Sequence, residues 1–262
     1  MARETGCARR FASPAGGAVV KLDDRVALVT GAGRRVGRAL AVALGRERMS
    51  VAVHYNSSAD GAKETVAEIE AAGGKAEIFQ ADLASARAPA ELVEAVAAKL
   101  GGLAVVVNSA AVMEKTPIGA VTPEAWDAMF ALNLRAPFMI SQAAAPLMKS
   151  AGGVIVNIAD LAAFESWPAY IPHSITKAAI VKMTSSLARV LAPEIRVNAI
   201  APGAVLLPAH WEEESAERLV STTPLERLGD PEDVVQAMLY LLRSDFVTGE
   251  TLIVDGGRHV RK

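Results

Sequence analysis

Two side chains that can move or stabilise charge stand four residues apart in the stretch YIPHSITKAA, residues 170–179. On an α-helix, residues four apart share a face, so His173 and Lys177 would point at the same place. An imidazole exchanges protons near neutral pH, and a nearby ammonium favours the neutral ring, which is a poor acid. The pair therefore indicates a site of proton transfer, provided that a carboxylate within hydrogen-bond reach restores the charged ring. The structural alternative for His173 is a hydrogen-bonded helix residue in a site without catalysis.

The elements that must position this pair are predicted from the spacing of apolar residues and turn residues. Short β-branched runs predict seven strands: Val26–Thr30, Ser50–His54, Lys75–Gln80, Ala104–Asn108, Val154–Ile158, Arg196–Ala201 and Leu252–Val254. Longer segments predict helices over Gly37–Arg46, Ala59–Ala72, Pro89–Leu100, Glu124–Lys149, Ile171–Leu191 and Pro231–Arg243. Because strands and helices alternate, we expect a single-domain α/β Rossmann fold with a doubly wound, mostly parallel sheet of about seven strands.

A glycine-bearing turn links the first predicted strand to a helix in the sequence VALVTGAGRRVGRAL. Its first two glycines permit a tight turn and close backbone approach, and the third lets the helix pack near the strand. The free N–H groups at the start of such a helix are suited to a pyrophosphate. The predicted dinucleotide site comprises Gly31, Gly33, Arg34, Arg35, Val36 and Gly37.

The end of the second predicted strand indicates which dinucleotide is bound. An NAD site usually places Asp or Glu there to accept a hydrogen bond from the ribose 2′-hydroxyl. This chain has His54, Tyr55, Asn56 and Ser57 instead, with two arginines in the glycine turn. Because guanidinium groups favour phosphate, we expect NADPH rather than NADH. The alternative is that both arginines are solvated surface charges.

The composition excludes several classes of function. The chain has 262 residues, 52% of them apolar and 21% charged, with a formal net charge of −2. This balance gives no electrostatic argument for nucleic acid or an anionic membrane as a partner, and no apolar run reaches the ~20 residues that span a bilayer. Four scattered histidines and the single Cys7 predict no metal site, no internal disulfide and a cytoplasmic location.

The first 22 residues differ from the rest of the chain. They contain Arg, Ser and small residues but no apolar core of the kind found in a secretory signal. We therefore expect residues 1–22 to be a flexible tail and residues 23–262 to form the domain. Within it, a segment near 204–223 is the natural place for a substrate lid, with a solvated amphipathic helix in its charged half.

Several motifs together make the chain from Asp23 onward similar to the short-chain dehydrogenase/reductase family. They are TGAGRRVG at 30–37, ADLA at 81–84, VNSAA at 107–111, Asn133 within ALNLRAPF, Lys177, RVNAIAPG at 196–203 and VTGETLIVDGG at 247–257. The resemblance implies oxidation or reduction of a small molecule with a nicotinamide cofactor. It also implies a homotetramer assembled through the predicted helices Glu124–Lys149 and Ile171–Leu191.

The same resemblance implies roles for individual residues. Asp82 and Leu83 would flank the adenine, and Asn108 and Ala110 would lie on the adenosine side. Pro202 and Gly203 would lie beside the nicotinamide. Lys177 would bind the nicotinamide ribose, and Asn133 would hold a water molecule near that lysine.

Within the family, the chain is most similar to pteridine reductases. Three features carry this likeness: Arg35 where most members have glycine, the pair His54-Tyr55, and Asp160 where most members have the catalytic serine. In pteridine reductases this aspartate is combined with a tyrosine and a lysine, and His173 here stands in place of that tyrosine. Asn56 and Ser57 also replace a His-Arg pair found in some members.

The substrate pocket is predicted to include residues near the active-site helix and the lid. They are Met113, Trp167, Tyr170, His210 and Trp211, although the two tryptophans would serve equally as packing residues.

The chemistry leaves three functions open. The leading hypothesis is an NADPH-dependent reductase acting on a pterin or a similar C=N heterocycle, with Asp160, His173 and Lys177 at the site. The second is a carbonyl or 3-oxoacyl reductase that uses His173 as the acid. The third is an NADP(H)-binding sensor or scaffold without turnover, which the exchange of tyrosine for histidine favours.

Overall fold

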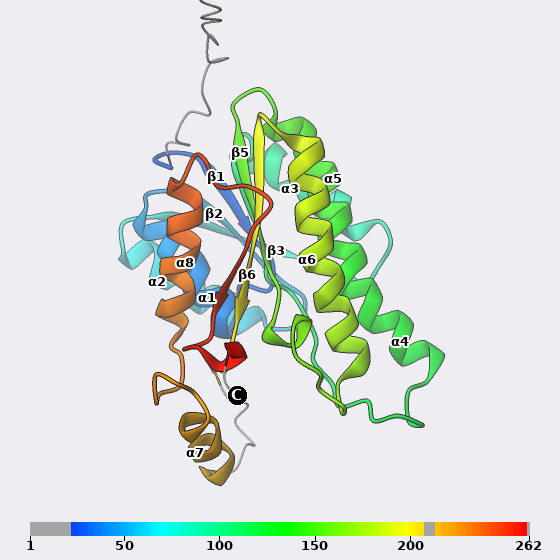
Figure 1. The fold of residues 1–262 in the computed structure, drawn as a ribbon. Coiled ribbons are helices and arrows are strands. Elements are labelled where there is room, and N and C mark those ends of the chain that lie inside the picture. Colours follow the sequence, from blue (N-terminus) through cyan, green and yellow to red (C-terminus); the bar gives the residue numbers. More distant parts are fainter. Residues whose placement is uncertain (1–21, 207–212, 261–262) are drawn as a thin grey trace, which may run out of the picture.

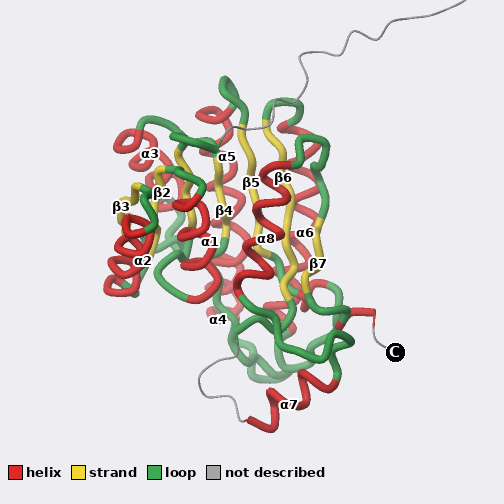
Figure 2. The backbone as a smooth tube through the Cα atoms, turned by 90° about the vertical axis from the view of Figure 1, so that its left-hand side faces the viewer, coloured by secondary structure: helices red, strands yellow, loops and turns green. Residues whose placement is uncertain are grey.

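The β-branched runs of the sequence form seven parallel strands in the computed structural model, which describes residues 22–206 and 213–260. The strands are β1 (Val26–Val29), β2 (Ser50–Tyr55), β3 (Lys75–Gln80), β4 (Val105–Asn108), β5 (Gly153–Ile158), β6 (Ile195–Pro202) and β7 (Thr251–Val254). They form one sheet in the order β3-β2-β1-β4-β5-β6-β7, which runs across Figure 2 from β3 on the left to β7 on the right. The predicted fold class is confirmed.

Helices cover both faces of this sheet (Figure 1). One face carries α1 (Arg35–Arg46), α2 (Ala59–Ala71) and α8 (Pro231–Arg243). The other carries α3 (Ala88–Leu100), α5 (Ala136–Met148) and α6 (Ile171–Leu191). This coverage explains why the central strands are continuous apolar runs, since both faces of a parallel sheet are buried.

The alternation of side chains along β1 shows how the two cores form. Ala27 and Val29 point to one face and belong to the cluster with α1 and α8. Leu28 points to the other face and packs in the cluster with α3 and α5. All three side chains are fully buried. A change of register by one residue would exchange the two sets, so the apolar pattern fixes the pairing.

The carboxyl ends of the strands meet at one edge of the sheet, where the candidate site lies. The strand order reverses between β1 and β4, because β2 and β3 lie on one side of β1 while β4 to β7 follow on the other. In sheets of this kind, ligands bind outside the carboxyl ends at such a switch point.

One predicted element is wrong in detail. The single helix predicted over Glu124–Lys149 consists of α4 (Pro123–Phe130), a π-helical segment (Ala131–Arg135) and α5. A π-helical segment accommodates one extra residue per turn, which apolar periodicity does not reveal, and such segments are common at functional sites. Asn133 lies inside it.

Two boundaries bear on the predicted domain and lid. Leu22 is buried and packs in the core with α1 and α8, so ordered structure includes this residue. The charged end of the predicted lid forms the short helix α7 (Glu213–Ser221). No helix within the described ranges has the length and apolar character needed to cross a bilayer.

Candidate active site

Asp160, His173 and Lys177 converge, although Asp160 comes from a different element. Asp160 follows β5 and caps a 3-10 helix (Leu161–Ala163), accepting a 2.8 Å hydrogen bond at Oδ1 from the N–H of Ala162. Its Oδ2 lies 3.6 Å from Nε2 of His173 on α6. Because one carboxyl oxygen is held by the backbone, the other is fixed toward the imidazole.

The imidazole of His173 is buried and has a defined tautomer. Its Nδ1 lies 3.2 Å from the carbonyl oxygen of Val112. A carbonyl oxygen only accepts hydrogen bonds, so Nδ1 carries the proton. In the neutral ring Nε2 is then an acceptor, and this buried atom has no hydrogen-bond partner in the structure. The unpartnered nitrogen faces Asp160.

Lys177 lies on the same helix face, one turn beyond His173. Its side chain is almost fully buried, and Nζ donates a 2.8 Å hydrogen bond to the carbonyl oxygen of Ile158 at the end of β5. Burial lowers the pKa of Lys177 from 10.5, and the charge of Asp160 acts in the opposite direction. An ammonium has three donors, so two remain for other partners.

Asn133 reaches this site through the backbone of Val112. Its Oδ1 accepts a 2.9 Å hydrogen bond from the N–H of Val112, and its Nδ2 donates a 2.9 Å bond to the carbonyl oxygen of Val112. Nδ2 also lies 3.3 Å from Oγ1 of Thr176. The same carbonyl oxygen serves His173, so Asn133 holds the group that sets the histidine tautomer.

The glycine turn is shaped so tightly that side chains would not fit. Gly31 has a left-handed φ of 67°, and a Cβ there would lie 2.9 Å from Cα of Ala110. A Cβ on Gly37 would lie 2.3 Å from the carbonyl oxygen of Gly31. Thr30 ties this turn to the end of β4, because its Oγ1 accepts 3.0 Å bonds from the N–H groups of Ser109 and Ala110. A bare backbone at the start of α1 fits a pyrophosphate.

The side chain of His54 is buried against the glycine turn and does not face solvent. Its side chain is 2% exposed, with Nδ1 accepting a 3.1 Å bond from the N–H of Gly31 and Nε2 lying 3.1 Å from the carbonyl oxygen of Ala81. Burial lowers the pKa of His54 to about 4, although the Ala81 carbonyl acts in the opposite direction. The ring is therefore neutral at physiological pH.

The other predicted cofactor residues lie at the ends of β3, β4 and β6. Asp82 is exposed, and Leu83 is buried in the core. Asn108 is buried, and its Nδ2 donates to Oδ1 of Asn157 at 2.8 Å and to Oγ of Ser141 at 3.3 Å. The side chain of Asn108 therefore joins β4 to β5 and to α5. Pro202 ends β6 beside Gly203.

The residues predicted to select the cofactor lie around the glycine turn and after β2. Arg34, Arg35, Asn56 and Ser57 are exposed, whereas Val36 and Tyr55 are partly buried. Arg35 has a left-handed φ of 54°, and its guanidinium donates to the carbonyl oxygen of Leu206. A left-handed conformation is unusual for a residue with a side chain. It accompanies a contact between the turn and the start of the predicted lid.

The predicted substrate residues lie near the start of α6 and in the loop after β4. Met113 is 44% exposed. Tyr170 directly precedes α6, and its ring meets the Trp167 ring edge-on with 6.3 Å between centroids. The indole of Trp167 donates a 2.9 Å hydrogen bond to Glu165. His210 and Trp211 lie outside the described residues.

Two functional contributors were not predicted from the sequence, Val112 and Thr176. Both act through atoms that residue type does not reveal: Val112 through its backbone, and Thr176 through a hydroxyl that donates to the carbonyl oxygen of His173 at 2.7 Å. The one available signal for Thr176 is its position directly before Lys177 on the active-site helix.

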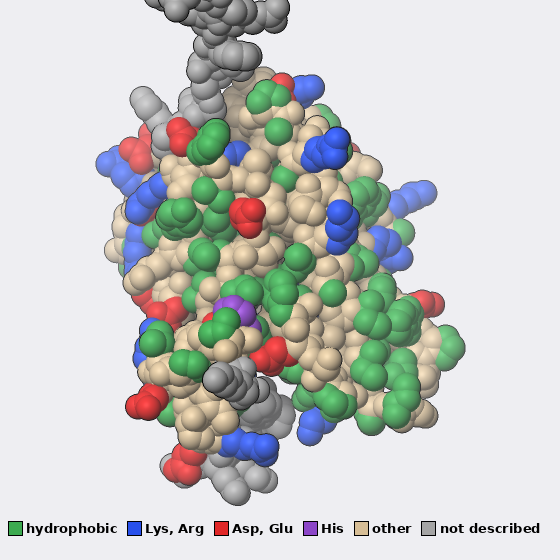
Figure 3. All heavy atoms as spheres, in the orientation of Figure 1, with side chains coloured by type: hydrophobic (Ala, Val, Ile, Leu, Met, Phe, Trp, Pro, Cys, Tyr) green, Lys and Arg blue, Asp and Glu red, His purple; other side chains and the backbone are tan. Residues whose placement is uncertain are grey.

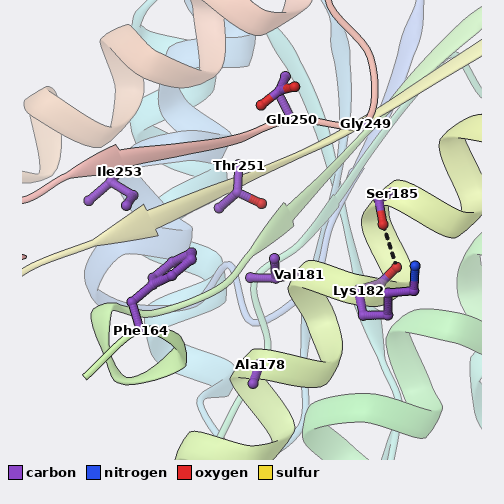
Figure 4. Close-up of a pocket in the computed structure, with 9 residues that line it drawn as sticks. All are labelled: Phe164, Ala178, Val181, Lys182, Ser185, Gly249, Glu250, Thr251 and Ile253. Carbon is purple, nitrogen blue, oxygen red and sulfur yellow. Dashed lines mark hydrogen bonds between the residues drawn. The ribbon is translucent and has the colours of Figure 1, made fainter. Parts of the chain in front are cut away.

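A hollow of about 410 Å³ lies between β7 and α6 (Figure 4). Its lining residues include Phe164, Val181, Ser185 and Thr251. No residue predicted from the sequence to be in the site lines it. Among the described residues, no three His, Cys, Asp or Glu side chains group closely enough to hold a metal ion.

Comparison with known proteins finds relatives over most of the chain. A family model described as enoyl-(acyl carrier protein) reductase matches residues 31–259. The chain is 36% identical over 241 residues to a 3-oxoacyl-[acyl-carrier-protein] reductase of Synechocystis, covering 90% of this chain and 97% of the relative.

Solved structures are similar over almost the whole chain. FolM alternative dihydrofolate reductase 1 from Brucella canis, complexed with NADP, superposes with a TM-score of 0.87 at 31% identity, covering 92% of this chain and 96% of the other. A mutant of a Serratia marcescens short-chain dehydrogenase/reductase has a TM-score of 0.86 at 32% identity, with coverages of 91% and 99%. The chain therefore belongs to the short-chain dehydrogenase/reductase family of NAD(P)-dependent oxidoreductases.

Proposed function

We propose that the protein is an NADPH-dependent reductase of a C=N bond in a pterin or similar heterocycle, and that Asp160 and His173 together hold the proton. The observation that carries this proposal is the buried Nε2 of His173, which faces Oδ2 of Asp160 at 3.6 Å without a hydrogen-bond partner.

The two facing atoms need one proton between them. The Val112 carbonyl commits the proton of the neutral imidazole to Nδ1, so Nε2 and an ionised Asp160 would both be acceptors. Two facing acceptors are unfavourable where one of them, the His173 ring, is buried. One additional proton, on either the imidazole or the carboxyl group, turns this arrangement into a donor and an acceptor. The pair is thus suited to store a proton and release it to a substrate.

A C=N substrate suits this acid better than a ketone does. Reduction adds a hydride to carbon and a proton to nitrogen, and an imine nitrogen is more basic than a carbonyl oxygen, so it takes up the stored proton more readily. The nicotinamide cofactor supplies the hydride when bound. Lys177 holds positive charge beside the site, and its two remaining donors are suited to ribose hydroxyls. The name of the Brucella canis structure, a dihydrofolate reductase, supports the same class of substrate.

We propose NADPH because the site combines exposed arginines with no acid after β2. Arg34 and Arg35 lie at the exposed start of α1, and Asn56 and Ser57 follow β2. A guanidinium stabilises a 2′-phosphate, and no carboxylate at the end of β2 would repel it. Replacing Arg34 by Ser is expected to weaken NADPH binding and leave NADH binding unchanged. An equal loss of affinity for NADPH and NADH would show that Arg34 does not contact the 2′-phosphate and instead attracts the pyrophosphate that both cofactors share.

The experiment that tests the substrate class is NADPH oxidation, followed by absorbance, with several acceptors. Dihydrobiopterin, quinonoid dihydropterin and dihydrofolate represent C=N substrates, and simple ketones and a 3-oxoacyl thioester represent carbonyl substrates. Oxidation with the first group alone supports the proposal, and oxidation with the second group alone refutes it. Tight NADPH binding without oxidation by any acceptor would favour a sensor or scaffold.

A carbonyl or 3-oxoacyl reductase is the second candidate. The observation in its favour is the 36% identity to the Synechocystis 3-oxoacyl-[acyl-carrier-protein] reductase. In this function His173 would act as the acid in its charged form, with Asp160 as its counter-ion.

We also propose that the protein assembles as a homotetramer through the face formed by α4, α5 and α6. This face exposes large apolar side chains, which Figure 3 shows gathered near α4. They include Trp126, Phe138, Leu147, Ile175 and Val190. Such a patch typically marks an interaction surface. Light scattering after size-exclusion chromatography tests this: a mass of four chains is expected for the wild type, and a monomer would refute it.

A further inference from the structure

The ring of His54 joins two loops that belong to different strands. It projects from β2, is 2% exposed, and contacts the backbone of Gly31 after β1 and of Ala81 after β3. A backbone N–H only donates and a carbonyl oxygen only accepts. The contact from Gly31 therefore requires a bare Nδ1, and the contact to Ala81 requires a proton on Nε2. Only the neutral ring with its proton on Nε2 satisfies both.

The backbone of His54 reinforces the same connection. Its carbonyl oxygen accepts a 2.8 Å hydrogen bond from the N–H of Ala32, next to the Gly31 N–H that the ring accepts. A single residue thus holds two consecutive N–H groups of the glycine turn. The N–H of Ala81 donates in turn to the carbonyl oxygen of Tyr55, next to His54.

Both loops form parts of the cofactor site. The Gly31 loop packs closely against the end of β4, since a Cβ on Gly31 would lie 2.9 Å from Cα of Ala110. The Ala81 loop continues into Asp82, whose Oδ1 accepts a 3.0 Å bond from the N–H of Ala84 and orders the segment. A displacement of either loop relative to the other would alter the distance between the pyrophosphate-binding turn and the adenine side.

We propose that His54 is a positioning residue that sets the distance between the glycine turn and the Ala81–Ala84 loop, and thereby the affinity for NADPH. Its buried ring uses both nitrogens on backbone groups of these two loops, so it acts through them. Its removal therefore weakens cofactor binding and leaves the chemical step at saturating cofactor unaltered. This inference rests on dinucleotide binding by the family and does not depend on the C=N substrate.

The test compares His54→Leu with a matched control, Asn198→Leu. Asn198 is also fully buried in the sheet, and also joins a backbone N–H to a backbone carbonyl: Oδ1 accepts from Glu250 at 3.1 Å and Nδ2 donates to Val247 at 2.9 Å. Both variants lose one accepted and one donated bond. The Kd for NADPH is measured by titrating nicotinamide fluorescence, which needs no turnover.

The expected result is a Kd raised about tenfold or more in His54→Leu, and an unchanged Kd in Asn198→Leu at a similar loss of thermal stability. An unchanged Kd in His54→Leu overturns the proposal. Equal increases in both variants also overturn it, since they would reflect general loosening of the sheet. With any acceptor that is turned over, KM for NADPH should rise while kcat stays constant.

Two further variants decide the matter if His54→Leu does not fold. Asn places its amide oxygen near the position of Nδ1 and keeps the bond from Gly31, whereas Gln places its amide nitrogen near Nε2 and keeps the bond to Ala81. Each is expected to give an NADPH affinity below that of the wild type, with folding retained. Wild-type affinity in both would show that neither contact sets the cofactor site.

Discussion

The side-chain amide of Asn133 makes two hydrogen bonds of 2.9 Å with the backbone of Val112, one at each of its polar atoms. The carbonyl oxygen of Val112 then also accepts from Nδ1 of His173. A residue in the π-helical segment between α4 and α5 thus controls the protonated nitrogen of an imidazole on α6. The backbone of Val112 is therefore part of the geometry of the site, together with the side chains of Asp160 and His173.

Replacing Asn133 by Asp tests this relay. The new carboxylate oxygen would face the Val112 carbonyl where a donor now stands, so we expect a loss of about 1–3 kcal/mol in the free energy of unfolding and a lower kcat. Urea unfolding and steady-state kinetics measure the two effects. Asn198→Asp is the control, because it opposes the Val247 carbonyl in the same way and should lower stability alone. Similar kcat losses in both variants would contradict the relay.

Replacing Asp160 by Asn removes the proposed proton carrier and preserves its surroundings. Asn is also a good cap, so the bond from Ala162 to the side-chain oxygen should persist. We expect kcat for the preferred acceptor to fall by about 10²–10⁴-fold, with NADPH affinity unchanged. Asp127→Asn, on the exposed surface of α4, should behave as the wild type. An Asp160→Asn enzyme with full activity would remove Asp160 from this role.

The affinity for NADPH should decrease at alkaline pH, beginning at a lower pH than the ordinary pKa of lysine, because Lys177 loses its proton there. Burial lowers the pKa of Lys177 from 10.5, so the ammonium loses its proton at a lower pH than a solvated lysine does. As the pH rises through this lowered value, the Kd for NADPH should increase. Lys177→Met should bind NADPH weakly at every pH, without this increase in Kd. Lys182 is exposed on the same helix, and Lys182→Met should retain the increase. If Kd still rises with pH in Lys177→Met, another titrating group causes the increase.

His54 should make the fold less stable in mild acid. Its pKa is lowered from 6.5 to about 4 in the folded protein. Between these values the unfolded chain binds a proton that the folded chain does not, so stability is full above about pH 6.5 and falls as the pH drops toward 4. The loss attributable to His54 is at most about 3 kcal/mol. Urea unfolding at pH 7 and pH 4.5 should show a wild-type decrease that is smaller in His54→Leu; equal decreases would contradict this assignment.

The alternation of strands and helices in the sequence predicted the fold, and the spacing of glycines predicted the tight turn after β1. Seven β-branched runs and the helices between them predict the parallel sheet because burial on both faces requires continuous apolar strands. The glycines at 31 and 37 also allow the tight turn to be predicted, since only glycine fits where a Cβ would meet backbone atoms. The spacing of His173 and Lys177 on one helix face also followed from local geometry.

The tautomer of His173 and the contacts that support the site become visible only in the folded chain. Nothing local to His173 shows that Val112 fixes its tautomer, because the contact is a backbone oxygen 61 residues away. Likewise, the position of His54 at the end of the second predicted strand suggested that it would contact the cofactor, whereas the folded chain turns its ring inward between Gly31 and Ala81. The π-helical segment at Asn133 is also invisible to periodicity, as one extra residue in a turn leaves the apolar pattern helical. Side-chain type fixes which hydrogen bonds a residue can make, and only the meeting of distant backbone groups fixes which ones it does make.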